Sequence, residues 1–433
     1  MPIYERLINI PADEMPRRWY NIDADMPWPV PPPKDAPDTK IKIKDLPKVL
    51  LKRCLEHEES KERWIRIPDD VIDLYLLVGR PRPLHRAYNL ERRLKTPARI
   101  YFKREDLAPT GSHKMNHALP QVYFAKEEGV GRLVTETGAG QWGTAMAYAC
   151  ALLGMPITIY WVRSAYKLKR DRYSFMKMCG ADVVPSPSDR TEIGKKFLKE
   201  NPEHPGNLAI ALAEAAEDAF VHEDTKYPIG SVEKHVLIYA TINGLETMKQ
   251  FELIDEDPDL MIGCYGGGSN FAGFVFPFVG EVLQKKRECE FLAVQCTPGS
   301  LVKGEYRYDY VDSGKMFPMA KTLTLGIDVF PPPRIAEGLR YAAGGSPQVC
   351  LLVHKGVIKA TYYDDEKPIA EAAKLVLETE GFLPAPESAY AVKAGIDEAL
   401  KCKKTGEEKV IAINISGHGY LDFPGYRKLL PEL

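Results

Sequence analysis

Four short glycine-containing segments hold most of the polar residues that could do chemistry. They are GSHKMN (111–116), ETGAGQWG (136–143), GGGSN (266–270) and SGHG (416–419). In open α/β sheets, ligands bind beyond the carboxyl ends of strands, where such turns occur. Each segment alone is a weak signal. Together they predict one cleft lined by all four.

The GGGSN segment follows a predicted strand and precedes a predicted helix. Bare glycines allow backbone N–H groups to converge on an anion, and the start of a helix adds positive potential. The segment lacks the pattern of a dinucleotide fingerprint and the Gly-Lys-Ser/Thr of a P-loop. Three consecutive glycines cost more conformational entropy than an ordinary turn requires. We interpret it as a site for one terminal phosphate, made by Gly266, Gly267, Gly268, Ser269 and Asn270.

Lys114 stands where the first segment opens a predicted helix. Most lysines are solvated surface residues, but this one has Gly111, His113 and Asn116 beside it. An amine that loses its proton in an apolar cleft becomes a nucleophile toward aldehydes. A phosphate site and such a lysine in one cleft suggest pyridoxal phosphate held by Lys114 as a Schiff base.

The other two segments suggest a substrate site and a cofactor contact. Glu136 suits proton delivery to a leaving hydroxyl, although a glutamate there could instead only favour the helix dipole. Ser416, at a strand end, could meet the ring nitrogen of the cofactor or only bond its own turn. Amides at the start of a helix suit a substrate carboxylate, and the candidates are Thr137, Gly138, Ala139, Gly140 and Gln141.

Predicted strands and helices alternate around these segments. Strands are expected at 98–106, 132–140, 156–162 and 410–419, with a strand-turn-helix unit at 260–283. The alternation predicts parallel sheets with crossover helices. We expect an α/β protein with two lobes, twisted and mostly parallel sheets, and the ligand in the cleft between the lobes. The expected division is 1–78 (N-terminal arm and start of the first lobe), 79–110 (segment crossing to the second lobe), 111–245 (first lobe) and 246–433 (second lobe).

Residues 22–48 contain MPWPVPPP and a KIKIKDLPK run. Such a proline-rich stretch is expected to be extended and semi-rigid. A strap on the surface is the main interpretation, and an arm that docks a partner is the alternative.

Composition excludes several classes of function. Lys plus Arg number 58 against 60 Asp plus Glu, so no net field favours nucleic acid or an anionic membrane. The eight cysteines form no CxxC, and no metal site is expected. Glycine and proline interrupt both long uncharged runs, at 137–162 and 262–280, and the first residues lack the apolar core of a signal peptide. We therefore expect a cytoplasmic protein with a small-molecule substrate.

Five motifs in order resemble those of the tryptophan synthase β-chain family. They are GSHKMN, ETGAGQWG, GGGSN, GFLPAPESAYA (381–391) and NISGHGYLD (414–422). The long N-terminal arm and LRYAAGGSP (339–347) resemble the second type of that family, common in archaea and some bacteria. The resemblance runs from about residue 79 to 425. It departs from the main type at Trp142, where that type has histidine, and at 418–422, where it has Arg-Gly-Asp-Lys-Asp.

The resemblance implies a fold type II, pyridoxal-phosphate-dependent lyase. The implied reaction replaces the hydroxyl of L-serine with indole, in tryptophan biosynthesis or indole salvage. Lys114 would be the Schiff-base lysine and Glu136 the acid/base, with the 137–141 amides on the substrate carboxylate. The residues implied around the cofactor and substrate are His113, Asn116, Glu387, Ser416 and, on a mobile loop, Asp328.

The resemblance also implies a homodimer and allows a tryptophan synthase α chain and a monovalent cation. Two other functions stay open at this point. One is a lyase like serine or threonine dehydratase, and the other is a catalytically silent binding subunit.

Overall fold

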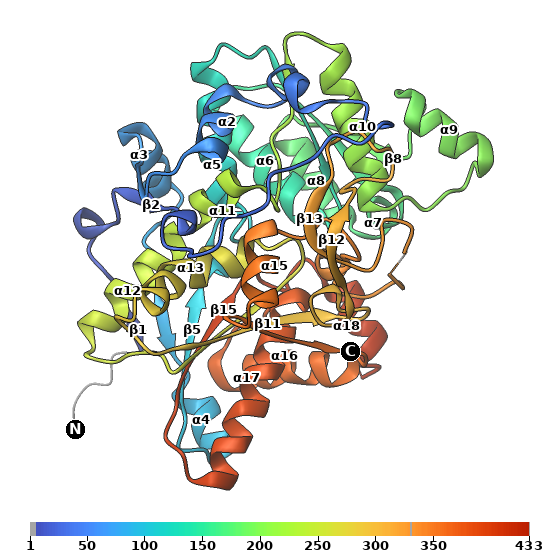
Figure 1. The fold of residues 1–433 in the computed structure, drawn as a ribbon. Helices are drawn as coiled ribbons and strands as arrows, with labels where there is room; N and C mark the ends of the chain where they lie inside the picture. The colour runs from blue at the N-terminus through green and yellow to red at the C-terminus, as the bar shows by residue number, and fades with distance from the viewer. Residues whose placement is uncertain (1–5, 330, 433) are drawn as a thin grey trace.

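The computed structural model describes residues 6–329 and 331–432, whose strands form two main sheets (Figure 1). The larger sheet has seven strands in the order β1-β4-β5-β15-β10-β11-β14. The strands from β5 to β14 in that order run parallel, whereas β1 and β4 are antiparallel. Their bounds are β1 (Leu7–Ile8), β4 (Leu84–Arg86), β5 (Arg99–Arg104), β10 (Leu260–Cys264), β11 (Glu290–Cys296), β14 (Lys359–Tyr363) and β15 (Val410–Ile415).

The smaller sheet has four parallel strands in the order β8-β7-β6-β9. Two antiparallel pairs, β2–β3 and β12–β13, lie outside the main sheets. The predicted α/β class with mostly parallel sheets is confirmed. The bounds are β2 (Arg18–Tyr20), β3 (Trp64–Arg66), β6 (Arg132–Thr137), β7 (Ile157–Val162), β8 (Asp182–Ser186), β9 (Thr225–Lys226), β12 (Glu305–Asp309) and β13 (Ala320–Thr324).

Helices cover the sheets (Figure 1). The α-helices are α1 (Leu46–Val49), α2 (Lys52–Glu59), α3 (Asp69–Leu77), α4 (Tyr88–Leu94), α5 (Met115–Glu127), α6 (Gln141–Leu153), α7 (Arg163–Leu168), α8 (Arg170–Met178), α9 (Glu192–Glu200), α10 (Leu208–Val221), α11 (Lys234–Ala240), α12 (Ile242–Leu253), α13 (Ser269–Leu283), α14 (Ser300–Lys303), α15 (Pro347–His354), α16 (Lys367–Glu380), α17 (Pro386–Thr405) and α18 (Phe423–Leu429). The 3₁₀ turns are η1 (Ala12–Glu14), η2 (Ile22–Ala24), η3 (Ile43–Asp45), η4 (Glu105–Leu107) and η5 (Glu337–Leu339).

Side chains of the larger sheet alternate between two hydrophobic cores. On β15, Ile411 and Ile413 join the core with α16 and α17, whereas Val410 and Ala412 join the core with α12 and α13. This is the two-residue period of a strand. Because both faces are covered, the strand is apolar along its length, as parallel strands generally are.

The proline-rich arm is bound along its length to the β12–β13 pair and the chain between those strands. Lys34 and Met319 exchange two backbone hydrogen bonds of 2.9 Å. The Lys40 and Ile41 amides donate to the carbonyls of residues 315 and 316, at 3.1 and 2.8 Å. Residues 34–41 of the arm are therefore bound to this part of the structure, whereas the end of the arm forms η3 and enters α1.

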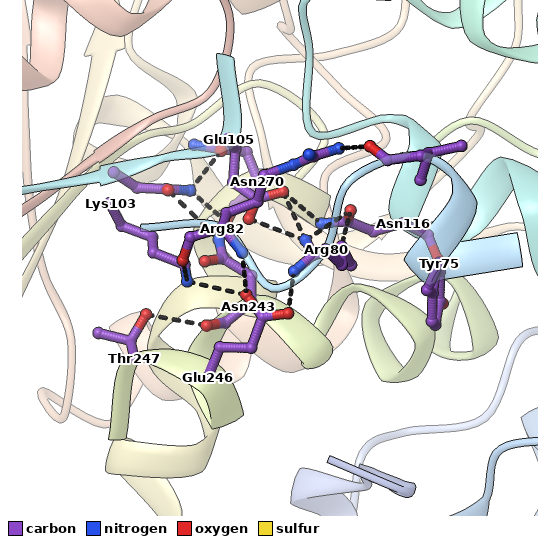
Figure 2. A network of polar contacts seen from close by, with 12 residues as sticks. Tyr75, Arg80, Arg82, Lys103, Glu105, Asn116, Asn243, Glu246, Thr247 and Asn270 are labelled. Carbon is purple, nitrogen blue, oxygen red and sulfur yellow. Dashed lines mark hydrogen bonds and ion pairs between the residues drawn. The ribbon is translucent and has the colours of Figure 1, made fainter. Parts of the chain in front are cut away.

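A cluster of buried charges joins β5, η4, α5 and α12 (Figure 2). The Arg80 guanidinium donates to both oxygens of Glu105, at 2.8 and 2.7 Å, and to the Asn116 side-chain oxygen at 2.7 Å. Its other terminal nitrogen lies 2.7 Å from Glu246, which also pairs with Lys103 at 2.9 Å. The four charged side chains are at most 1% exposed. The two positive and two negative side chains thus neutralise each other's charge in a region that water does not reach.

Removing one charge from this cluster should destabilise the fold strongly. We expect Glu246→Gln to lower the free energy of unfolding by about 3–5 kcal/mol, because Lys103 would stay buried without a full counter-charge. The matched control is Glu432→Gln, which breaks a Lys374–Glu432 pair with side chains 42% and 51% exposed. That control should cost less than about 1 kcal/mol. Denaturant unfolding followed by circular dichroism measures both, and equal losses would contradict the expectation.

Candidate active site

The four predicted segments meet between the carboxyl ends of the two sheets. Lys114 is the N-cap residue of α5, and its Nζ lies 3.4 Å from the Ser269 hydroxyl at the start of α13. The His113 amide donates to the Ser416 carbonyl at 2.8 Å. The Gln141 amide nitrogen lies 3.5 Å from a Glu387 carboxylate oxygen. The four segments therefore lie next to one another, as the sequence analysis expected of residues at one site.

The Lys114 side chain is half-buried and its amine has close neighbours. Its Nζ donates to the Gly230 carbonyl at 2.5 Å and lies 5.9 Å from the centre of the Trp142 ring. Burial lowers the pKa of Lys114 to about 8, although Glu136 opposes that effect. A lysine with this pKa supplies far more neutral amine near neutral pH than a solvated one.

The triple-glycine turn is enclosed by other parts of the chain. A Cβ on Gly266 would lie 2.1 Å from the Gly338 carbonyl oxygen, and one on Gly267 would lie 2.5 Å from the Ser231 hydroxyl. The N–H groups of residues 266–268 donate to no other described residue. The turn thus presents unpaired amides at the start of α13, an arrangement suited to an anion.

Sequence analysis missed the segment Tyr227–Ser231, which contacts three of the four predicted segments. The Tyr227 hydroxyl donates to Glu136, and the Gly230 carbonyl accepts from Lys114. The Ser231 hydroxyl lies 3.2 Å from the Ser269 hydroxyl and accepts from the Ser269 amide at 3.3 Å. Val232 follows with φ of 76°, a strained value for a β-branched residue. Pro228 and Gly230 predict a loop here but do not show what it contacts.

Glu136 lies at the end of β6, beside an apolar cavity of about 760 Å³. The residue is 7% exposed, and burial raises the pKa of its carboxyl group while the Tyr227 hydroxyl and the Lys114 charge oppose the rise. Among the apolar residues that line the cavity are Leu208, Leu212, Ile229 and Phe317. A carboxyl group that can gain or lose a proton therefore borders a space suited to an aromatic molecule.

The turn after Glu136 is fixed by its surroundings. Gly140 has φ of 93°, and a Cβ there would lie 2.8 Å from the Trp161 ring. The Trp161 indole N–H donates to the Gly138 carbonyl at 2.9 Å, and the Thr137 hydroxyl accepts from the Gly143 amide at 3.1 Å. The N–H groups of residues 138–140 have no acceptor in the part of the chain that the structure describes. Their arrangement would suit a second anion, such as a carboxylate.

Ser416, His113 and Glu387 are buried at the same place. The Ser416 hydroxyl lies 2.7 Å from that of Ser388 and 3.5 Å from the Cys264 sulfur. His113 is kept neutral because burial lowers its pKa well below the usual value, and its Nδ1 has no partner among the described residues. One Glu387 oxygen accepts from the Gly338 amide at 3.0 Å.

Three predicted site residues have other surroundings. The Asn116 side chain belongs to the buried charge cluster, where it donates to Glu105 at 2.8 Å (Figure 2). The Asn270 side chain donates to the Cys264 carbonyl at 3.1 Å and accepts from Asn414 at 2.7 Å. Asp328 is exposed in a turn, although its neighbours Ile327 and Val329 line the cavity. The structure does not bring Asp328 into the buried group.

Within residues 6–329 and 331–432, no group of three or more His, Cys, Asp or Glu side chains could hold a metal ion. No helix in those ranges has both the length and the apolar character needed to cross a membrane.

Comparisons with known proteins were made on both sequence and structure. Residues 75–417 match the family model described as "Pyridoxal-phosphate dependent enzyme". The chain is 51% identical to tryptophan synthase beta chain 2 of Methanothermobacter thermautotrophicus, over 97% of each chain. It is 50% identical to the tryptophan synthase beta chain of Thermococcus gammatolerans, over 97% of this chain and 96% of that one.

Solved structures share the fold at lower identity. The processed form of threonine deaminase isoform 2 from Solanum lycopersicum has a TM-score of 0.59 and 17% identity, covering 84% of this chain and 94% of that one. A fungal L-serine ammonia-lyase from Rhizomucor miehei has a TM-score of 0.58 and 17% identity, covering 81% and 98%. The expected fold type II architecture is confirmed. Since the family model matches most of the chain, and two relatives share half its residues over nearly its whole length, the chain belongs to the pyridoxal-phosphate dependent enzymes and, among them, to the tryptophan synthase β chains.

Proposed function

We propose that the chain catalyses the replacement of the L-serine hydroxyl by indole, which yields L-tryptophan and water. The observation that carries this proposal is the position of Glu136. Its carboxyl group borders a large apolar cavity and is acted on by the charge of the half-buried Lys114 amine. Relatives about half identical in sequence that bear the name tryptophan synthase beta chain support the same reaction.

The buried polar groups fit pyridoxal phosphate. The unpaired amides of 266–268 and the Ser269 and Ser231 hydroxyls suit its phosphate, and the Lys114 amine within 3.4 Å of Ser269 suits its aldehyde. Ser416 suits its ring nitrogen, and the unpaired His113 Nδ1 supplies a further polar contact. When bound, pyridoxal phosphate withdraws electrons from the α-carbon of an amino acid.

The protein's own groups then divide the work. The 138–141 amides would bind the carboxylate of L-serine and fix its orientation. The Lys114 amine, when neutral, can take a proton, and Glu136 can give one to the departing hydroxyl oxygen. The apolar cavity would hold indole and exclude water, which would otherwise compete with indole as the attacking group.

The neutral Ser416 hydroxyl favours elimination of the substrate hydroxyl over transamination. A hydroxyl can donate to a neutral ring nitrogen, whereas a carboxylate would favour a protonated one. Ser388, 2.7 Å behind Ser416, is also neutral. Because neither serine carries a charge, neither is expected to keep the ring nitrogen protonated and so increase electron withdrawal by the ring.

The alternative is a lyase that forms a keto acid from serine or threonine, as the names of the solved structures suggest for those proteins. Their 17% identity shows the fold alone. The apolar cavity beside Glu136 favours a reaction with an aromatic second substrate. Product analysis with and without indole separates the two functions.

Three associations stay predictions from the family resemblance: a homodimer, an α-chain partner and a monovalent cation. A cytoplasmic location stays a prediction from cysteine usage and the character of the first residues. Light scattering of the purified protein, alone and with an α chain, tests the first two.

Replacing Lys114 should remove the bound cofactor's characteristic spectrum. We expect Lys114→Ala to lose the visible absorbance band of the holoenzyme, because the Schiff base that produces the band is proposed to form on Lys114. The control is Lys126→Ala, which removes an exposed lysine from the same helix and should keep the band. A Lys114→Ala protein with an unchanged band and full turnover would refute the assignment.

The pKa of Lys114 predicts how cofactor capture depends on pH. The amine must be neutral to attack an aldehyde, and burial lowers its pKa to about 8. The rate at which cofactor-stripped protein binds added pyridoxal phosphate should therefore rise with pH and level off above about pH 8. Stopped-flow absorbance measures this rate. A rate still rising steeply near pH 10 would indicate an ordinary solvated lysine.

Removing the acid from Glu136 should slow turnover while cofactor stays bound. We expect Glu136→Gln to retain the visible band and to lose about 10²-fold or more in kcat, the usual scale for general acid/base catalysis. Steady-state formation of L-tryptophan measures the loss. Glu127→Gln, an exposed change on α5, serves as control. Near-normal turnover by Glu136→Gln would remove this residue from the proposed reaction.

A further inference from the structure

Tyr227 makes the closest side-chain contact to Glu136, yet no step described above uses it. We infer that Tyr227 is a positioning residue, whose hydroxyl holds one oxygen of the Glu136 carboxyl group so that the other oxygen exchanges the proton with substrate. This inference rests on the role proposed for Glu136 and extends it to a residue outside the sequence motifs.

Both side-chain hydrogen bonds to the Glu136 carboxyl group reach the same oxygen. The Tyr227 hydroxyl donates to Oε2, and the Thr135 hydroxyl lies 3.4 Å from the same atom. Thr135 has one hydroxyl proton, and the Pro228 carbonyl accepts it at the shorter distance of 2.8 Å. Tyr227 is therefore the principal donor. No side chain among the described residues donates to Oε1, which stays available for substrate.

Tyr227 is itself held through both its ring and its backbone amide. It stacks on Phe317 with centroids 5.8 Å apart and planes inclined by 23°. The Asp312 carboxylate accepts from the Met316 and Phe317 amides, at 2.8 and 3.1 Å, and so fixes the turn that carries Phe317. The backbone amide of Tyr227 donates to the Val49 carbonyl at 2.8 Å. These contacts allow little choice in where the hydroxyl points.

The charges around Glu136 set the sign of the effect. Burial raises its pKa, and the Tyr227 hydroxyl and the Lys114 charge lower it again. Beyond burial, the Glu136 charge also raises the pKa of Tyr341, and the Asp312 charge raises the pKa of Tyr227. Because a donor stabilises the carboxylate form, loss of the Tyr227 hydroxyl must move the Glu136 titration to higher pH.

Tyr227→Phe tests the inference, because it keeps the stacked ring and removes only the hydroxyl. The readout is the infrared carboxylic-acid band of the holoenzyme, assigned to Glu136 by its disappearance in Glu136→Gln. We expect the midpoint of that band to rise by about one pH unit, the size of one hydrogen bond to a charged group. The kcat should fall about tenfold, with the KM for L-serine and the cofactor band unchanged.

Tyr341→Phe is the matched control. Tyr341 lines the same cavity, and its hydroxyl has no hydrogen-bond partner among the described residues. Its removal should leave the midpoint unchanged. A purely structural role for Tyr227 would predict a lower unfolding temperature for Tyr227→Phe without any shift of the band.

A second substitution should shift the Glu136 titration in the opposite direction, and it keeps the tyrosine hydroxyl so that the fold is retained. Placing 3-fluorotyrosine at position 227 makes the hydroxyl a stronger donor, so the midpoint should fall below that of the unmodified protein. An unmoved midpoint in Tyr227→Phe, or in the fluorinated protein if Tyr227→Phe does not fold, overturns the inference. Full turnover by Glu136→Gln would instead overturn the role of Glu136, so the two failures are distinguishable.

Discussion

The hydrogen bond from the Lys114 amine to the Gly230 carbonyl is the contact on which the site depends. This hydrogen bond fixes the end of a long, flexible side chain at one point between the sheets. Burial at that point lowers the amine pKa to about 8, which an exposed lysine on the same helix would not experience. The other contacts of the site serve either to keep water from this amine or to keep its neighbours at a fixed distance.

The segment that supplies the Gly230 carbonyl also fixes the other reacting groups. Tyr227 contacts the Glu136 carboxylate, and Ser231 contacts the start of the phosphate-type turn. Behind these residues, the charge cluster around Arg80 binds α5 to α12 through Asn116 and Glu246. Amine, carboxyl group and anion site therefore share supports, which is what pre-organised catalysis requires.

Sequence reasoning located several strands because each contains a short apolar run bounded by charged residues, proline or glycine. The predicted strands at 98–106, 132–140, 156–162 and 410–419 correspond to β5, β6, β7 and β15. The β12–β13 pair gave no such signal, since its strands are only partly buried and end without a glycine motif. A local sequence pattern reveals a strand that is buried on both faces more readily than a strand that pairs at the protein surface.

Site residues followed the same rule. Lys114, Glu136 and the 266–270 turn could be proposed because each lies at the end of a predicted strand or the start of a predicted helix. The Tyr227 contact could not, because it depends on the path of a loop 91 residues further along the chain. The partners of Asn116 could not either, because Arg80 comes from the loop after α3 and Glu105 from η4.

The pairing of the proline-rich arm with residues 315–319 has a consequence for how the chain can be shortened. Ile41 donates to the Met316 carbonyl, and the next residue, Phe317, forms both a wall of the aromatic cavity and the support of the Tyr227 ring. A truncated form lacking its first fifty residues would retain Lys114 and Glu136 but would lose residues that line the cavity, among them Trp28, Ile43 and Leu50. It would also lack the hydrogen bond from Ile41 to Met316, which precedes the Phe317 ring that supports Tyr227. The arm therefore contributes to the proposed active site even though it supplies no proposed reacting group.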